Sequence, residues 1–448
     1  MSAPTPARRA AYETLRRVFE EDAWADRSLR AAAERHDLAG RERAQAQALA
    51  YGAVQRRGTC DHFIAGLADR PIGRIDAPLL AALRLGLYEL LYGAAGGEHA
   101  AVDQAVSLAK GRGGRRHGAG LVNAVLRRAA REREALLDSL DDVDPEGAAV
   151  AHSVPVWLAD LWWEELGASG ARSLLAAINE PPERALRANG LRGGRDAALA
   201  ELAAAGVEGR PADPARPPAP DGSIIVAGGE RGRLDELIAR GTVVAQSRAS
   251  ALVVEVLAPE PGERVLDLCA GPGIKAGQVA AALGDAGGGL VAVEHHRGRA
   301  RELRAMLDRL GAGAARVERR DATAPQPPGS YDAVLVDPPC TGLGTLASRP
   351  DARWRRRPEQ VAELARLAER ILARALEAVA SGGRVVYSTC TVSRRENEAV
   401  AAAAGTRARD LGADPALAPL ASLHDHRFLQ TRNDRDGTDG FFIAALTP

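Results

Sequence analysis

The sequence lacks any long apolar run. No segment reaches the roughly 20 uninterrupted apolar residues that a membrane helix needs. The N-terminal stretch MSAPTPARRAAYETL also lacks the apolar centre of a signal peptide. These absences exclude a protein built on membrane-spanning helices, and we expect a cytoplasmic protein without a membrane partner.

Cysteine is scarce as well. Cys60, Cys269, Cys340 and Cys390 stand far apart and form no CxxC pair. Zinc knuckles and disulfide frameworks need paired or numerous cysteines, so the sequence predicts reduced thiols and no bound metal.

Lysine is nearly absent, because only Lys110 and Lys275 among the 59 basic residues are lysines. The 59 acidic residues bring the formal net charge to zero, so the overall charge does not indicate a nucleic-acid partner. In so arginine-rich a chain a single arginine carries little information, whereas each lysine invites a functional question.

The chain has 448 residues, which is more than one hydrophobic core usually organises. We expect three domains, over residues 1–140, 150–235 and 236–448. The first reads as an all-helical bundle, with apolar residues at helical spacing such as Leu79, Leu83 and Leu87. Nothing in the sequence indicates an obligate dimer, so we expect a monomer.

Two arginine-rich segments stand out. The first is KGRGGRRHGAGLVNAVLRRAARER, whose basic residues are Lys110, Arg112, Arg115, Arg116, Arg127, Arg128, Arg131 and Arg133. This run alone fits a solvated helix face as well as a phosphate-binding patch. The second, RPDARWRRR (349–357), has five arginines around Trp354 and favours an RNA clamp with a stacking platform over an ordinary helix lead-in. The tryptophans of VPVWLADLWWEELG, in contrast, are expected to pack a helix onto its neighbour.

From about Leu252 short apolar strands alternate with helical runs. The expected strands are Arg264–Leu268, Leu290–Glu294, Arg316–Glu318, Ala333–Asp337, Arg384–Ser388 and Phe441–Leu446. The clearest helix begins at Pro358, carries an apolar face that includes Val361 and Val379, and is followed by two glycines. Alternating β and α elements predict an α/β fold with a doubly wound, mostly parallel sheet, in which ligands bind at the carboxyl ends of the strands.

The first of these strands ends in a glycine-bearing turn into a helix. The turn residues are Cys269, Ala270, Gly271, Pro272, Gly273, Ile274 and Lys275. The turn has neither the Walker A spacing nor the dinucleotide fingerprint. Glu294, Asp321 and Asp337 follow three further strands, and Glu294 is placed to accept hydrogen bonds from ribose hydroxyls. Such an acidic pocket suits a cationic sulfonium, S-adenosylmethionine, better than a polyphosphate, and Lys275 either pairs with its carboxylate or orients a neighbouring acid.

Cys340 and Cys390 follow adjacent expected strands, so both thiols should reach one crevice. Methyl transfer to C5 of cytosine explains why an enzyme needs a thiol there. A thiolate that adds to C6 makes C5 nucleophilic, and the adduct is later released by base-assisted elimination. Asp337 is placed to hold the ring near N3 and to stabilise the charge that develops there.

The motifs DLCAGPGIK, DPPCTG, YSTCT and DGFFIAAL resemble those of the Nol1/Nop2/Sun family of RNA (cytosine-5) methyltransferases. The segments RERAQAQALAYGAVQRR and GLVNAVLRR are similar to the antitermination factor NusB, and this combination resembles the bacterial B-type 16S rRNA methyltransferases of the family. The resemblance implies a NusB-like helical RNA-binding domain, a small linker domain and a Rossmann-like methyltransferase domain. It also implies S-adenosylmethionine as cofactor, and 16S rRNA or a small-subunit assembly intermediate as partner.

In this family the cysteine of the YSTC-type motif forms the bond to C6, and the cysteine of the PC motif assists release. The resemblance therefore implies that Cys390 is the nucleophile and Cys340 the release residue, with Asp337 and Lys275 beside them. It also implies that Cys269 to Lys275, Glu294, Asp321 and Asp337 surround the cofactor. Ile274 departs from the usual glycine, which puts cofactor affinity rather than the reaction in doubt.

Other hypotheses compete with rRNA methylation. One is a NusB-like RNA-binding or assembly factor whose methyltransferase domain has lost turnover, against which the intact Cys340, Cys390, Asp337 and Lys275 speak. Another is cytosine-5 methylation of a different RNA such as tRNA. A methyltransferase for DNA or a small molecule is disfavoured by the helical region and by the context of Cys390.

Overall fold

The computed structural model describes residues 3–93, 97–110, 118–284, 289–327 and 330–448. These residues divide into two compact units. The first, here called the helical unit, contains residues 1–179 and 348–355, and the second, the sheet unit, contains residues 180–347 and 356–448. Among the described helices, none is long and apolar enough to cross a membrane.

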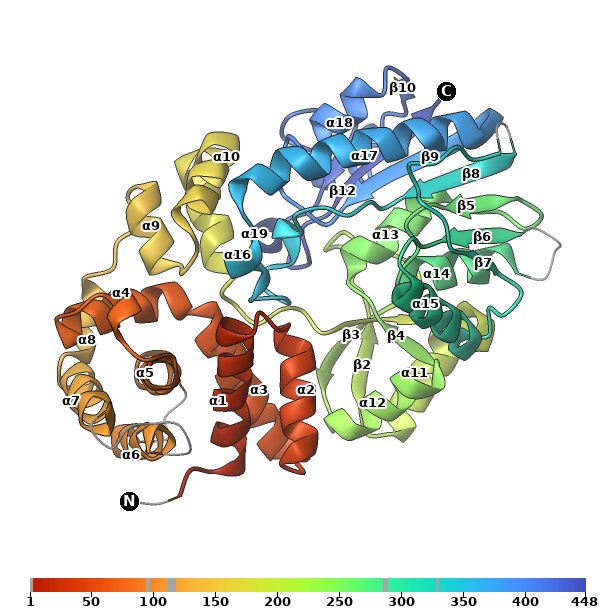
Figure 1. Ribbon diagram of the computed structural model, residues 1–448. Coiled ribbons are helices and arrows are strands. Elements are labelled where there is room, and N and C mark those ends of the chain that lie inside the picture. The colour runs from red at the N-terminus through yellow and green to blue at the C-terminus, as the bar shows by residue number, and fades with distance from the viewer. Residues whose placement is uncertain (1–2, 94–96, 111–117, 285–288, 328–329) are drawn as a thin grey trace. The chain divides into compact units, whose positions relative to one another are not determined.

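The helical unit is built of α-helices (Figure 1). Their bounds are α1 Pro6–Glu20, α2 Ala25–Arg35, α3 Gly40–Gln55, α4 Arg57–Ala68, α5 Ala77–Tyr92, α6 Glu98–Ala109, α7 Gly118–Arg131, α8 Arg133–Asp138, α9 Pro145–Ala151, α10 Val156–Ala177 and α16 Ala352–Arg355. The expected all-helical N-terminal region is confirmed. Trp162 of α10 is fully buried, as expected for a packing residue.

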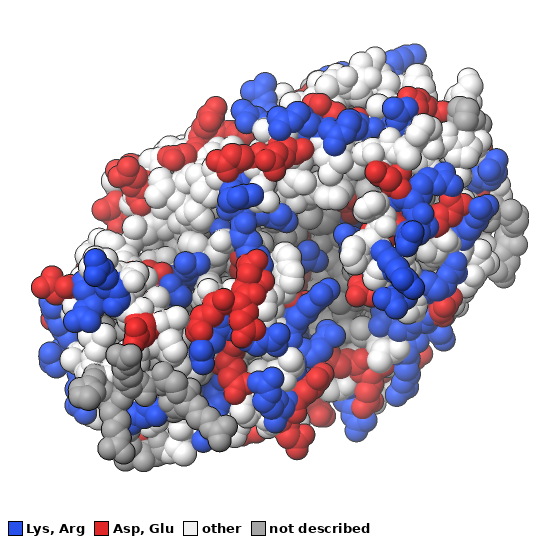
Figure 2. Space-filling view, viewed as in Figure 1, with Lys and Arg blue, Asp and Glu red and all other residues white. Residues whose placement is uncertain are grey.

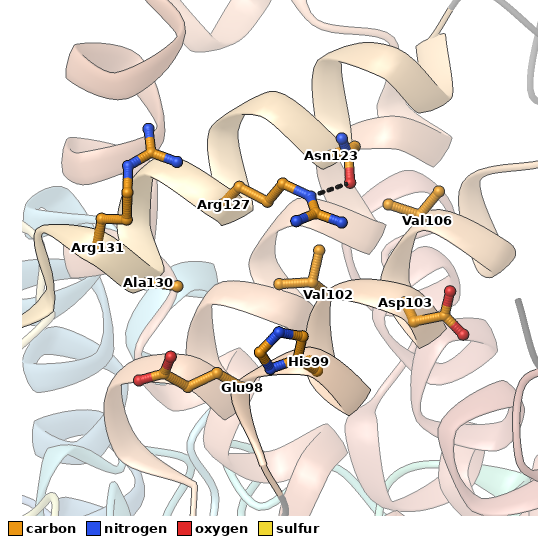
Figure 3. Close-up of a pocket in the computed structure, with 9 residues that line it drawn as sticks. All are labelled: Glu98, His99, Val102, Asp103, Val106, Asn123, Arg127, Ala130 and Arg131. Atoms are coloured by element: carbon orange, nitrogen blue, oxygen red, sulfur yellow. Dashed lines mark hydrogen bonds between the residues drawn. The ribbon is translucent and has the colours of Figure 1, made fainter.

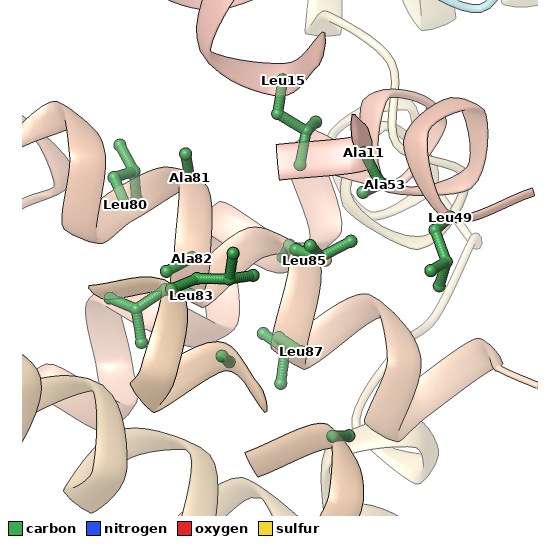
Figure 4. Close-up of a cluster of buried hydrophobic side chains, with 14 of the residues drawn as sticks. Ala11, Leu15, Leu49, Ala53, Leu80, Ala81, Ala82, Leu83, Leu85 and Leu87 are labelled. Atoms are coloured by element: carbon green, nitrogen blue, oxygen red, sulfur yellow. The ribbon is translucent and has the colours of Figure 1, made fainter. Parts of the chain in front are cut away.

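Helix α5 forms the centre of this unit. It is apolar nearly all round, which is typical of a helix surrounded by other helices. Leu83, Leu85 and Leu87 are almost completely buried and belong to the same core as Leu15 of α1 and Leu49 of α3 (Figure 4). The strongly periodic sequence of this region therefore encodes a single contiguous core.

Segment 348–355 comes from far along the chain but folds as part of the helical unit. Arg353 is fully buried, and its guanidinium donates to the carbonyls of Ser153 and Ile178, each at 3.2 Å, and to Asn179 Oδ1 at 3.0 Å. The Trp354 indole donates to the Val54 carbonyl at 2.7 Å. The prediction of an RNA clamp is therefore wrong for Arg353, because it is fully buried and its terminal nitrogens donate to oxygens of the helical unit. The stacking role of the half-buried Trp354 stays a prediction.

The other arginines of this segment differ from one another. Arg355 lies over the Trp24 ring at 4.4 Å and forms an ion pair with Asp22 at 2.7 Å, so it too serves the helical unit. Arg349 and Arg357 are exposed, and their contact with RNA stays a prediction.

The sheet unit begins with a small antiparallel sheet, which has strand order β2-β3-β1-β4. Its elements are β1 Ala185–Ala188, α11 Gly194–Ala204, β2 Glu208–Pro211, β3 Ser223–Gly228, α12 Arg231–Arg240 and β4 Val243–Ala245. The expected bounds of the middle domain, 150 and 235, stay a prediction. Helix α10 belongs to the helical unit, and α12 and β4 extend the small sheet to Ala245 because Leu234, Leu237 and Val243 complete its core.

The large sheet has the order β10-β12-β9-β8-β5-β6-β7, and β11 pairs with β12. Its strands are β5 Val265–Asp267, β6 Leu290–Val293, β7 Arg316–Glu318, β8 Tyr331–Val336, β9 Val379–Thr389, β10 Arg407–Ala408, β11 Leu429–Gln430 and β12 Phe442–Thr447. The strands from β7 through β5 to β9 are parallel, and β12 is antiparallel to β9. The expected Rossmann-like fold is confirmed, and all six expected strands are present.

Helices cover both faces of the large sheet (Figure 1). Helices α13 Arg248–Leu257, α14 Ile274–Leu283 and α15 Arg297–Leu310 pack on one face, and α17 Pro358–Ala378 and α18 Glu398–Ala403 on the other. In β8, Ala333 and Leu335 face the first core, whereas Val334 and Val336 face the second. Because both faces are buried, the strand reads as a continuous apolar run.

Helix α17 ends earlier than expected. Val379 was placed on its apolar face, but the structure assigns this residue to β9, where it pairs with Tyr331 of β8. Pairing with a neighbouring strand outweighs the helical periodicity at this point.

Strand order locates the ligand-binding edge. The chain leaves β5 toward β6 and β7 on one side and later returns to β8 and β9 on the other. At such a switch point the loops after adjacent strands diverge and leave a crevice at their carboxyl ends. The motifs that follow β5, β8 and β9 all lie at this edge.

Candidate active site

The two thiols lie in contact. Cys340 follows β8 and Cys390 follows β9, and their Sγ atoms are 3.3 Å apart. None of the four cysteines, all of which lie in the described part of the chain, is in a disulfide. The hydrogen bond to Cys390 and burial raise the pKa of Cys340. The sequence expectation that both thiols share one crevice is confirmed.

The other two cysteines behave differently. Cys60 is fully buried in the helical core, and burial raises its pKa. Burial and the neighbouring Asp267 carboxylate raise the pKa of Cys269. Both thiols are thereby held in the unreactive protonated form.

Backbone hydrogen bonds tie three motif loops together. Gly344 N donates to the Cys390 carbonyl at 3.0 Å, and Gly440 N donates to the Gly344 carbonyl at 2.7 Å. A Cβ atom on Gly344 would come within 1.9 Å of the Gly440 carbonyl oxygen. Glycine is therefore required at this crossing, where the loops after β8 and β9 meet the loop before β12.

Lys275 orients Asp337. Its Nζ donates to Asp337 Oδ2 at 2.5 Å, and Ser388 Oγ donates to the other oxygen at 3.4 Å. Lys275 also lies 4.9 Å from the centre of the Phe441 ring. Burial alone would lower the pKa of Lys275, but the charge of Asp337 and the hydrogen bond to it raise that pKa overall. Of the two roles left open for Lys275, the structure has the one that orients an acid.

The glycine turn after β5 is packed against Glu294. A Cβ atom on Gly271 would lie 2.2 Å from Glu294 Oε2. Glu294 is buried, accepts from His296 N at 2.8 Å, and forms an ion pair with Arg299 at 3.2 Å. Arg299 also donates to the Gly271 carbonyl at 3.0 Å. The acid that follows β6 is thus held against the turn, and its hydrogen bonds to a ribose stay a prediction.

The rest of this turn is shaped by its backbone. Gly273 has a φ of +111° and precedes α14, and a Cβ atom there would lie 3.0 Å from both Leu303 and Met306. Ala270 is buried, and its amide donates to the Val293 carbonyl at 2.9 Å. Ile274 is the first residue of α14, so its branched side chain begins a regular helix and causes no break in the turn.

Asp321 has a different environment from the other predicted acids. It is exposed, and Oδ1 accepts from Thr323 N at 2.9 Å and from Thr323 Oγ1 at 2.8 Å. These hydrogen bonds lower its pKa. The carboxylate stabilises its own turn at the edge of the site, and its contact with a cofactor stays a prediction.

Two acidic residues near the site were not predicted from the sequence. Asp267, the last residue of β5, is buried, and its Oδ2 has no hydrogen-bond partner among the described residues. Burial and the charge of Asp337 raise its pKa to about 7. The motif DLCAGPGIK contains Asp267, and its place at a strand end was an available signal. The second, Glu396, is buried beside the Cys340 loop, and no motif in the sequence marks it.

These acids fit a cationic cofactor. A buried carboxylate oxygen without a partner is rare unless a ligand satisfies it. Asp267 supplies such an oxygen beside the turn, and Glu294 supplies a carboxylate held against Gly271. Within the residues that the structure describes, no group of three or more metal-binding side chains is placed to hold a metal ion.

The predicted basic patch of the helical unit is only partly described, because residues 111–117 lie outside the described residues. Arg133 donates to the carbonyls of Leu90 and Leu91 at the end of α5, so it caps that helix. Arg128 pairs with Glu132 at 2.9 Å. On the face seen in Figure 2, basic and acidic side chains are interspersed. The phosphate-binding role of this patch stays a prediction.

A pocket of about 360 Å³ lies between α6 and α7 (Figure 3). Arg127 points toward Asn123 and donates to its Oδ1 at 3.0 Å. Glu98 and Asp103 also line the pocket, together with Val102. Its mixed charge distinguishes it from a purely phosphate-binding patch.

Comparison with known proteins agrees with this geometry. The family model described as 16S rRNA methyltransferase RsmB/F matches residues 254–447. The NusB family matches residues 5–131, and the ferredoxin-like domain of RsmF/B-like methyltransferases matches residues 154–219.

Relatives extend over nearly the whole chain. A probable ribosomal RNA small subunit methyltransferase B of Synechocystis is 35% identical over 88% of this chain and 87% of its own length. The ribosomal RNA small subunit methyltransferase B of Thermus thermophilus is 36% identical over 94% and 92%. A putative methyltransferase of Mycobacterium tuberculosis is 37% identical over 98% and 96%.

The chain belongs to the 16S rRNA methyltransferase RsmB/F family. The structure of PH0851 shares its fold, with a TM-score of 0.80, 23% identity and 100% coverage of both chains. NSun6 from Pyrococcus horikoshii, solved with SFG, has a TM-score of 0.56 and 19% identity, and covers 65% of this chain and 98% of its own.

As a member of the RsmB/F family, the chain is a methyltransferase that depends on S-adenosylmethionine. The NusB-like region and the Rossmann-like region expected from the sequence are both confirmed.

Proposed function

We propose that this RsmB/F family member methylates C5 of a cytosine in 16S ribosomal RNA through a covalent bond between Cys390 and C6. The observation that carries the proposal is the contact of 3.3 Å between the Cys340 and Cys390 sulfur atoms at the carboxyl ends of adjacent strands. The names of the family and of its relatives supply the rRNA substrate.

The electrostatics favour Cys390 as the attacking thiolate. Cys340 is kept protonated, so its S–H can donate to the Cys390 sulfur and stabilise a negative charge there. Lys275 places a half-buried ammonium group in the same site, where its charge and that of Cys390 interact. A nearby cation favours a thiolate.

The proposal assigns residues to the bond with C6, to the release of the product and to the holding of the ring. The Cys390 sulfur bonds to C6, and the electron pair of the C5=C6 double bond makes C5 nucleophilic. S-adenosylmethionine supplies an electrophilic methyl group. A base then takes the proton from C5, the C5=C6 bond re-forms, and the bond between sulfur and C6 breaks with its electrons returning to Cys390. Cys340 assists this release, and Asp337, oriented by Lys275 and Ser388, holds the ring.

A purely structural role as an assembly factor is less well supported. Such a protein would have no need for two thiols in contact, or for a half-buried ion pair between Lys275 and Asp337 at the same strand ends. Burying these groups is costly, and proteins concentrate such costs at functional sites.

The two cysteines can be separated by substitution. We expect Cys390→Ala to abolish methylation and to form no covalent RNA adduct. Cys340→Ala should accumulate an adduct that survives a denaturing gel. The reverse pattern would exchange the two roles, and methylation without any adduct in either variant would exclude the covalent mechanism.

The substrate is tested in cells. Bisulfite sequencing of 16S rRNA from strains with and without the gene should show one or more cytosines that lose methylation in the deletion strain. Complementation with Cys390→Ala is the matched control and should not restore the mark. An unchanged rRNA map with a changed tRNA map would move the substrate to tRNA.

A further inference from the structure

The residue after each thiol is a fully buried threonine. Thr341 follows Cys340, Thr391 follows Cys390, and their hydroxyl oxygens are 2.8 Å apart. One O–H must donate to the other oxygen at this distance. The two loops that carry the reactive sulfur atoms are therefore joined directly beside those atoms.

Glu396 holds this junction, the hydrogen-bonded pair Thr341 and Thr391, through two hydrogen bonds from Thr341. Its Oε1 accepts from Thr341 N at 2.8 Å, and its Oε2 accepts from Thr341 Oγ1. Because the Thr341 hydroxyl donates to Glu396, its oxygen is the acceptor for Thr391. Only 1% of Glu396 is exposed, and burial raises its pKa to about 7. A carboxyl group this deeply buried is destabilising unless it is hydrogen-bonded, and both oxygens of Glu396 accept from Thr341.

The same junction is anchored to rigid elements. Tyr387 of β9 donates its hydroxyl to the Glu396 carbonyl at 2.5 Å. Asn397, the next residue, accepts from Thr389 Oγ1 at 2.6 Å and donates to the Thr391 carbonyl at 3.1 Å. The loop after β9 is thus held from both sides of Cys390.

Arg356 holds the other loop. Its Nε donates to the Thr341 carbonyl at 2.7 Å, and its Nη2 to the Cys340 carbonyl at 3.3 Å. The backbone of Cys340 is therefore fixed by Arg356 on its carbonyl side and by Glu396 through the amide of the next residue.

We infer that Thr341, Thr391 and Glu396 form a clip that fixes the spacing of the two thiols and so positions Cys340 for release of the methylated product. The inference rests on the proposed function, in which Cys340 assists cleavage of the bond between Cys390 and C6. The three are positioning residues, because they hold the loops that carry the sulfur atoms. A misplacement of about 1 Å in a catalytic group costs roughly 100-fold in rate, so a loosened clip should slow release strongly.

The first test follows the adduct through a single turnover. Thr341→Val and Thr391→Val keep the shape of the side chain and remove the hydroxyl, whereas Thr391→Ser keeps the hydroxyl and is the control. With 16S rRNA and S-adenosylmethionine, we expect adduct to form within about threefold of the normal rate in both valine variants. It should decay at least about tenfold more slowly, and decay in Thr391→Ser should match the unmodified enzyme. Equal decay in all four proteins, or an equal loss in formation and decay, would overturn the clip.

The second test needs no RNA. In a glutathione buffer, Cys340 and Cys390 can be oxidised to a disulfide while oxidised glutathione is reduced to two thiols, and the equilibrium reports the effective concentration of one sulfur at the other. We expect this value to fall about tenfold in Thr391→Val and in Glu396→Gln, and to stay unchanged in Thr391→Ser. Unchanged values in every variant would refute the clip even if methylation were proved. A protein that forms no RNA adduct but shows the tenfold fall would refute the proposed function alone.

Discussion

Arg353 in the helical unit and Asp267 in the sheet unit are both charged side chains that are buried almost completely. Burial lowers the pKa of Arg353 to about 9 and raises that of Asp267 to about 7. They differ in the number of hydrogen bonds that the charged group makes. Both terminal nitrogens of Arg353 donate, to the carbonyls of Ser153 and Ile178 and to Asn179 Oδ1, whereas Asp267 accepts from Cys269 N at 3.3 Å and its Oδ2 has no hydrogen-bond partner among the described residues.

This difference separates a structural charge from a functional one. Arg353 supplies hydrogen bonds that the surrounding carbonyls would otherwise lack, so its charge is part of what stabilises the helical unit. Asp267 gains little within the protein, and its burial is explained by a cationic ligand that is not part of the chain. Substitutions at the two sites should therefore change stability in opposite directions.

The largest effect is expected at Arg353. Arg353→Met keeps much of the side-chain volume but removes the donor to the Ser153 carbonyl and to Asn179 Oδ1, whereas the Ile178 carbonyl still accepts from Gln55. Each unsatisfied buried group costs about 1–3 kcal/mol. The free energy of unfolding should fall by roughly 3 kcal/mol, measured by urea denaturation. The exposed Arg357→Met is the matched control and should stay within about 0.5 kcal/mol. No loss in Arg353→Met would mean that burying the charge costs as much as its hydrogen bonds contribute.

Asp267→Asn should stabilise the protein in the absence of S-adenosylmethionine. The folded-state pKa of Asp267 is raised from 3.8 to about 7, so its favourable contribution is complete below the lower value and is lost as pH rises through about 7. At pH 8 the variant should be more stable, by on the order of 3 kcal/mol. The gain should vanish near pH 4, and denaturation series at both pH values test this. A gain of equal size at both would exclude ionisation of Asp267 as its cause.

The next largest effect is expected on the affinity for S-adenosylmethionine, through the ionisation of Asp267. Asp267 must lose its proton to face a cationic ligand, and Asp337, Lys275 and Glu294 are the other charged groups that act on it. S-adenosylmethionine should bind about tenfold more tightly at pH 8 than at pH 6, measured by calorimetry. Asp267→Asn should weaken binding at pH 8 and remove the pH dependence of binding. The exposed Asp321→Asn is the control and should show the same pH dependence as the unmodified protein.

The smallest effect is expected for the two exposed arginines of the segment that contains Arg353. Arg349→Gln and Arg357→Gln should leave stability unchanged. Each should weaken binding of a 16S rRNA fragment by a few fold and reduce the salt dependence of the binding constant by about one unit of slope. Unchanged binding in a variant that carries both substitutions would exclude a contact of these two arginines with RNA.

Much of the sheet unit could be predicted because its signals are local. Short apolar runs such as Ala333–Asp337 indicate buried strands, and glycines such as Gly271 and Gly273 indicate turns. The parallel sheet then brings the ends of the strands together. That Cys340 and Cys390 should reach one crevice followed from their places after two expected strands, whereas their contact did not. Glu396 could not be found in this way, because its role depends on a hydrogen bond to a loop 55 residues earlier.

The arginine segment 349–357 shows the opposite case. Its composition fits an RNA clamp, but the acceptors that occupy Arg353 are carbonyls of residues 153 and 178, and carbonyls leave no signal in a sequence. The domain boundaries were also difficult, because the small sheet continues beyond its proline-rich loop to β4 and the helical unit takes a segment from within the methyltransferase region.

That borrowed segment affects the order in which the chain can fold during translation. Residues 1–179 leave the ribosome long before residues 348–355, so the oxygens that Arg353 satisfies have no such donor until the strand Tyr331–Val336 has been synthesised. Domains made on the ribosome generally fold as units from the N-terminus. In this protein the helical unit emerges first, but it is complete only after most of the sheet unit has been synthesised.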